Sequence, residues 1–103
     1  MKKQTTVKGV LLAAARLLER SGWCQNSLHD DGRYCVVGAL NHSITGDWDH
    51  PRTRDEVAWE LLASARRRLA QAVGVEDIVA WNNAMGQRRR HVIAALRKAA
   101  RTA

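Results

Sequence analysis

The first pattern in this chain is an apolar residue every three or four positions, which is the period of an amphipathic helix. It begins near the N-terminus and covers residues 6–20. The apolar positions of this segment are Val7, Val10, Leu11, Ala14, Leu17 and Leu18. Either Thr5 or Thr6 can cap the start of such a helix, and Gly22 is a natural stop. We therefore predict a first helix with one buried face.

The same period returns twice in the second half of the chain. A long helix is predicted up to Gly74, and Thr53 with Glu56 fits a capping box at its start. Its apolar positions are Val57, Ala58, Leu61, Leu62, Ala65, Leu69, Ala72 and Val73. A last helix is predicted over about residues 88–101. Its apolar positions are Val92, Ile93, Leu96, Ala99 and Ala100.

The most apolar run, residues 34–40, fits two structures. Val36 and Val37 favour a strand. We prefer a buried helix over about residues 34–44, because the sequence shows no second strand to pair with it. Gly38 would then lie on a small face that lets another helix approach closely. The preceding turn, residues 30–33, has Gly32 at the position that needs a positive φ.

The shorter segments complete the prediction of the fold. Residues 46–51 are expected to form a loop, residues 75–81 a short helical turn and residues 81–86 a connector. A length of 103 residues allows one core but not two. We predict an all-α fold, a compact single-domain bundle of four to five helices over residues 1–103, with no sheet.

Composition narrows the class of protein. An apolar fraction of 46% argues against disorder. No run approaches the roughly 20 apolar residues of a membrane span. The basic start resembles that of an export signal, but Arg16 and Glu19 interrupt the apolar stretch that follows. We expect a cytoplasmic protein without a membrane partner, in which both cysteines stay reduced.

Positive charge is concentrated in the second half of the chain. The net charge is +7, and residues 60–103 carry nine Lys or Arg against three Asp or Glu. The clustered cations are Arg66, Arg67, Arg68, Arg88, Arg89, Arg90, Arg97 and Lys98, with Arg101 close by. Such a face predicts an acidic partner, because arginine favours two-point contact with carboxylate or phosphate. No helix-turn-helix spacing supports reading of bases, and self-association into a homo-oligomer is left open.

Two other groups of residues suggest sites. Trp48, between two aspartates, is the tryptophan most expected to be exposed and to contact a partner. Cys35 in the first turn of a helix could be an activated thiol, with Gln25 as an oxyanion donor and one of four histidines as base. The competing interpretation is that Cys35 is a small buried residue. The Asp and His residues near positions 30 and 48 lack the spacing of a zinc site, so we predict no metal and no cofactor.

A family resemblance is carried by three short motifs. They are Gly22-Trp23-Cys24-Gln25, Cys35 followed by Gly38-Ala39-Leu40, and Trp81-Asn82 before the last helix. Together they resemble a small family of unknown function from actinobacteria and their phages. The family pattern has Asp after Trp-Asn and then Gly-Arg-Thr, whereas this chain has Asn83 and Gly86-Gln87-Arg88. The resemblance implies a compact helical fold and a phage origin, and supplies no activity.

The functional prediction combines charge and resemblance. We expect a non-enzymatic binding protein that contacts an acidic protein surface of a host through its arginine-rich face. Non-specific nucleic-acid binding is the first alternative. A cysteine-dependent hydrolase built on Cys35 is the second alternative.

Overall fold

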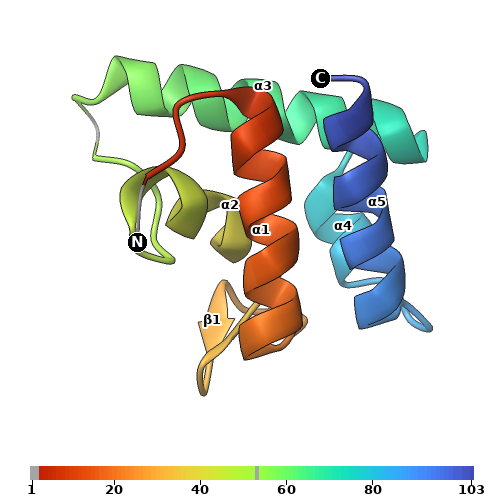
Figure 1. Cartoon of the computed structure of the whole chain (residues 1–103). Helices are drawn as coiled ribbons and strands as arrows, with labels where there is room; N and C mark the ends of the chain where they lie inside the picture. The colour runs from red at the N-terminus through yellow and green to blue at the C-terminus, as the bar shows by residue number, and fades with distance from the viewer. Residues whose placement is uncertain (1–2, 53) are drawn as a thin grey trace.

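The structure is a computed structural model that describes residues 3–52 and 54–103. Over these residues it has five helices and one short hairpin (Figure 1). The helices are α1 (Val7–Ser21), α2 (Val36–Thr45), α3 (Glu56–Val73), α4 (Ile78–Asn82) and α5 (Arg89–Arg101). The hairpin pairs β1 (His29–Asp30) with β2 (Arg33–Tyr34) in antiparallel register, His29 opposite Tyr34. The predicted helical bundle is confirmed.

Helices α1 and α5 form the centre of the arrangement. They lie side by side and run in opposite directions, while α3 crosses the end of the pair at which α1 begins and α5 ends (Figure 1). Helix α2 packs against both α1 and α3, and α4 contacts α2 and α3. None of the described helices is long and apolar enough to cross a membrane.

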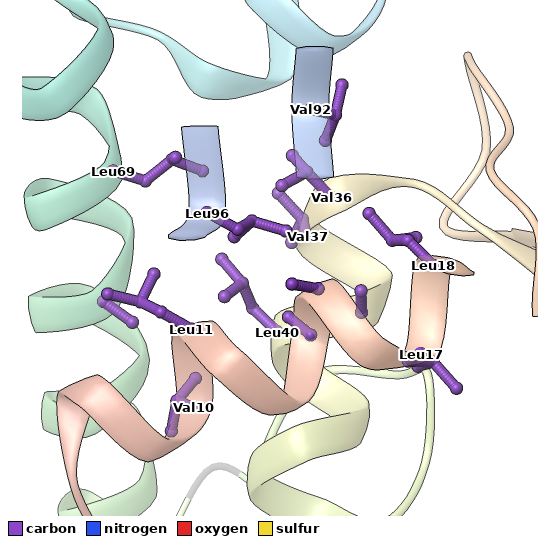
Figure 2. Close-up of a cluster of buried hydrophobic side chains, with 14 of the residues drawn as sticks. Val10, Leu11, Leu17, Leu18, Val36, Val37, Leu40, Leu69, Val92 and Leu96 are labelled. Carbon is purple, nitrogen blue, oxygen red and sulfur yellow. The ribbon is translucent and has the colours of Figure 1, made fainter. Parts of the chain in front are cut away.

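One core joins these helices. Leu11 of α1, Leu40 of α2, Leu69 of α3 and Leu96 of α5 are fully buried and point toward one another (Figure 2). Each such side chain contributes about 1.5–3 kcal/mol by leaving water. The predicted apolar faces of the three long helices therefore meet around Leu40, in the run of residues 34–40.

The start of α2 differs from the prediction. Tyr34 belongs to β2, Cys35 is the residue that caps α2, and the helix begins at Val36. The expectation of no second strand was wrong, because residues 29–30 supply one. That strand has only two residues, too few to show an alternating pattern. The predicted turn at Gly32 is confirmed, with Gly32 at φ 79° and Asp31 at φ 50°.

Gly38 is needed for a contact other than the predicted one. A Cβ built on Gly38 would lie 2.0 Å from the carbonyl oxygen of Leu28, so the close neighbour is a loop backbone and not another helix. The N–H of Cys35 donates to the same oxygen at 3.3 Å. The segment before the hairpin is thus held directly against the first turn of α2.

The N-terminal caps of α3 and α4 also differ from the prediction. Asp55 caps α3 by accepting from the N–H of Ala58 at 3.0 Å, whereas Thr53, the predicted cap, lies outside the described residues. Gly74 ends α3 in the left-handed conformation, as expected. Asp77 caps α4, which includes Trp81 and Asn82. The short helical turn predicted over residues 75–81 is therefore confirmed for residues 78–81, and Asn82, predicted to lie in the connector, belongs to the helix.

Candidate functional site

A buried amide at the end of α4 links three segments of the chain. The Oδ1 of Asn82 accepts from Trp23 Nε1 at 2.7 Å and from the N–H of Val36 at 3.0 Å. Its Nδ2 donates to the carbonyl of Cys24 at 3.2 Å. Asn82 is almost fully buried, so each of these bonds is shielded from water. The motifs around Trp23, Cys35 and Asn82 therefore meet in space for a structural reason.

Gln25 completes this link and is not placed as an oxyanion donor. Its Nε2 donates to the carbonyls of Asn82 at 3.1 Å and Ala84 at 3.0 Å. The neighbouring Asn83 accepts through Oδ1 from the N–H of Asn26 at 2.8 Å and from Asn82 Nδ2 at 2.9 Å. A carboxylate oxygen accepts such bonds equally well.

Cys35 lines a small cavity of about 340 Å³ between the loop after α1, the start of α2 and α4. The cavity is lined by Asn26, Ser27, Leu28, Cys35, Val36, Val37, Val79, Asn82 and Asn83. The thiol is 8% exposed and its Sγ accepts from the N–H of Gly38 at 3.3 Å. Burial raises the pKa of Cys35 above its ordinary 9.0, although hydrogen bonds from the first turn of α2 oppose this. The burial of Cys35 and its raised pKa favour the interpretation as a small buried residue over that of an activated thiol.

The histidines occupy other positions. His29 stacks on Trp48 with ring centres 5.7 Å apart, and His50 stacks on Trp59 at 5.9 Å. His42 meets Tyr34 edge-on, and its pKa is lowered mainly by burial. No histidine lines the Cys35 cavity. Within the described part of the chain, the geometry supplies no general base beside this thiol.

A first prediction concerns the two thiols. Burial raises the pKa of Cys24 as well, with Cys35 as the second cause. Because the thiolate is the reactive form, we expect iodoacetamide to modify both cysteines at pH 7 at least about tenfold more slowly in the folded chain than in denaturant. Peptide mass spectrometry over time measures both rates. Rapid modification of Cys35 alone at pH 7 would restore the activated-thiol interpretation.

The same pKa shifts predict a dependence of stability on pH. The folded chain favours the protonated thiols, so this stabilisation is complete below the unfolded pKa of about 9 and is lost as pH rises through the folded pKa values. We expect the free energy of unfolding to fall as the pH rises above about 9. Replacing both cysteines by alanine should remove that part of the fall, which denaturant titrations at each pH would show.

The second candidate site is a groove with basic walls between α1 and α5. Its volume is about 350 Å³, and its walls carry four cations. The lining residues are Lys8, Leu12, Arg16, Arg97, Ala100 and Arg101. Of these cations, Arg97 belongs to the predicted clusters and Arg101 was noted beside them. Lys8 and Arg16 were missed because they come from the first helix, far away in sequence.

Exposed arginines extend this groove along α5. At 3.6 residues per turn, Arg90, Arg97 and Arg101 lie within about 40° of one another and span about 16 Å of the helix. We call Lys8, Arg16, Arg90, Arg97 and Arg101 the α1–α5 face. Helix α5 itself contains no acidic residue. Glu19 of α1 pairs with Arg97, and the carbonyl of Glu19 accepts from Arg89 at 3.3 Å.

The arginines of α3 are divided between two further depressions. Arg66 and Arg67 line one together with Glu76 and Asp77, which offset their charge. Arg67 and Arg68 line another with Val7 and Ala103, beside the α1–α5 face. Arg88–Arg90 lie at the start of α5, the end of that helix away from α3 (Figure 1). The structure therefore brings the last turn of α5, and not its first, close to the arginines of α3.

Two more predicted partner residues lie apart from the groove lining. Lys98 is exposed on the flank of α5, about 80° around the helix from Arg90. Trp48 is 38% exposed in the loop between α2 and α3. This loop lies on the opposite side of the molecule from α5 (Figure 1). A single partner contacting both Trp48 and α5 would therefore have to reach around the domain.

The chain belongs to a family of unknown function, DUF6197, whose model matches residues 2–102. The family resemblance of the three motifs is thereby confirmed over nearly the whole chain. No curated protein and no solved structure gives a significant match. The expected actinobacterial or phage source stays a prediction.

Proposed function

We propose that this protein is a non-enzymatic module that binds nucleic acid without base specificity through the α1–α5 face. The observation that carries the proposal is the row of Arg90, Arg97 and Arg101 on a helix without acids. Arg97 and Arg101 share a groove with Lys8 and Arg16, and Glu19 pairs with Arg97. Arginine and lysine in such rows contact successive phosphates, and binding then gains from the release of counterions.

The surroundings of the face favour a partner bound through charge, such as phosphate, over a folded protein bound through an apolar anchor. Protein interfaces depend on large apolar anchors at their centre. The exposed large apolar residues of the described chain are Trp48, Val57, Trp59, Val79 and Met85, and none of them is in α1 or α5. The apolar residues beside the cations of this face are the exposed Ala94 and, in the groove, Leu12 and Ala100. A partner recognised by charge alone fits this surface better than one that needs an apolar anchor.

We expect reversal of two cations to weaken binding strongly. Arg90→Glu with Arg101→Glu removes two phosphate contacts and should lower affinity for a short duplex about 10- to 100-fold at 0.1 M salt. Neither arginine forms an ion pair with a described residue, and both are exposed, so the melt should hardly change. At the helix ends the two substitutions have opposite dipole effects, which offset each other.

A matched control separates the face from net charge. Arg52→Glu with Arg54→Glu changes the net charge equally, at exposed positions in the loop between α2 and α3. This loop lies on the side of the molecule away from α5 (Figure 1). This control should bind duplexes of unrelated sequence as the wild type does, whereas the first variant should also lose about two units of salt slope. Fluorescence anisotropy against salt concentration measures both quantities. Equal loss in both variants, or no duplex binding by the wild type, would contradict the proposal.

A further inference from the structure

Charge is distributed unevenly over the two sides of this domain. The stretch 46–60 carries five acidic residues against two arginines. We call its acids, Asp47, Asp49, Asp55, Glu56 and Glu60, the acidic face. The loop before α3 is held against this helix, because Trp59 stacks on His50 and its Nε1 donates to the carbonyl of Arg52 at 3.0 Å. Glu56 and Glu60 lie in the first turns of α3, at the end of that helix away from α5, and the loop before α3 carries the other three acids (Figure 1).

Both charged faces are largely unneutralised within the molecule. The ion pairs among the described residues are Arg33–Asp30, His50–Asp49 and Arg97–Glu19. Asp47, Glu56 and Glu60 are exposed and have no cationic partner in these pairs, and the same holds for Arg90 and Arg101. Two exposed clusters of opposite sign on one chain are complementary to each other but lie too far apart to meet in the same copy.

An apolar groove lies beside the acidic face. It has a volume of about 570 Å³. Its apolar lining comes from Ile44, Val57, Ala58 and Leu61, and its polar lining comes from Lys3, Gln4, Thr5, Asp55, Glu60 and Ser64. Val57 is 76% exposed, which is unusual for a β-branched side chain on a helix that packs against a core. This surface offers apolar contact as well as negative charge, whereas the α1–α5 face offers charge and small alanines.

We propose that a second copy of this chain docks its α1–α5 face on the acidic face and its apolar groove. Charge complementarity identifies this partner. Helix α5 carries Arg90, Arg97 and Arg101 and contains no acidic residue, whereas the first turns of α3 carry Glu56 and Glu60. The contact joins two different surfaces, so it is heterologous. In a pair of copies, one copy keeps its acidic face free and the other keeps its α1–α5 face free. The copy bound in this way covers the surface proposed for nucleic acid, and the two partners compete.

Sedimentation velocity of the full chain at two ionic strengths tests the contact. We expect reversible association at roughly 20 mM salt, where charges interact over about 20 Å, and monomers at roughly 500 mM. Arg90→Glu with Arg101→Glu should abolish association at low salt. Glu56→Arg with Glu60→Arg should also abolish it, while leaving duplex binding intact. The second variant thus separates failure of self-association from failure of the proposed function.

Mixing the two variants gives the sharpest result. Each alone should be monomeric, but an equal mixture should associate, because the wild-type α5 of one meets the wild-type acidic face of the other. The control Arg52→Glu with Arg54→Glu has the same net charge as the α5 variant and should associate at least as well as the wild type. A wild type that stays monomeric at low salt, or a mixture that stays monomeric, would overturn the proposal. So would association of either variant alone.

Discussion

Gly38→Ala is expected to lower the free energy of unfolding by at least about 3 kcal/mol, enough to shift the melting temperature by more than about 12 °C. The added methyl group would lie 2.0 Å from the carbonyl oxygen of Leu28, well inside van der Waals contact. That oxygen accepts from the N–H of Cys35, so it does not move without breaking the link between the hairpin segment and α2. The position of a Cβ is fixed by its own backbone, and the Leu28 oxygen is also a backbone atom. No side-chain rotation therefore relieves this clash.

The chain contains a matched control for this substitution. Gly9 is the third residue of α1, as Gly38 is of α2, and the N–H of each bonds to the side chain of its cap. The nearest atoms to a Cβ on Gly9 belong to the side chains of Gln4 and Thr6, the Oγ1 of Thr6 at 3.0 Å, and none of them is backbone. Gly9→Ala should therefore change stability by less than about 1 kcal/mol. Equal thermal shifts in the two variants would show that the Leu28 contact is not the cause.

Asn82→Asp is expected to have the second large effect, a loss of about 3 kcal/mol or more. The carboxylate keeps an acceptor for Trp23 and Val36 but places a second oxygen against the carbonyl of Cys24, where Nδ2 now donates. A buried charge facing an acceptor is strongly unfavourable. Urea titration monitored by tryptophan fluorescence would measure the loss.

Asn83→Asp is the control for the Asn82 substitution. It makes the same chemical change one residue along the chain, at a position where Oδ1 only accepts hydrogen bonds, from Asn26 and Asn82. We expect a change below about 1 kcal/mol, because both accepted bonds survive. Comparable losses at the two positions would mean that the direction of the hydrogen bonds at Asn82 does not matter.

The sequence predicted those helices whose signals lie within the helix itself or directly beside it. The apolar period placed α1, α3 and α5, and the stop signals Gly22 and Gly74 both cap their helices. The hairpin was missed because two-residue strands have no period to detect. The N-terminal limit of α2 was missed for the same reason, since Tyr34 continues the apolar run while bonding as a strand.

The sites were harder to predict than the helices. The role of Asn82 depends on partners 46 and 59 residues away, and a polar residue after a tryptophan looks like an ordinary connector. The grouping of the cations depends on which helices pack together. The pairing of α1 with α5 brings Lys8 and Arg16 next to Arg97 and Arg101. The arginines of α3 and those at the start of α5 are instead kept apart by the direction in which α5 runs.

The position of Asn82 late in the chain has a consequence for synthesis. The indole N–H of Trp23 and the backbone N–H of Val36 receive their shared acceptor only when residue 82 has left the ribosome. Until then α1 and α2 also lack the apolar face of α5. The first half of the chain therefore leaves the ribosome with its apolar side chains exposed, and these are buried only when the second half has been synthesised. Folding should be a single late step, and fragments that end before α4 should be substrates for chaperones and proteases.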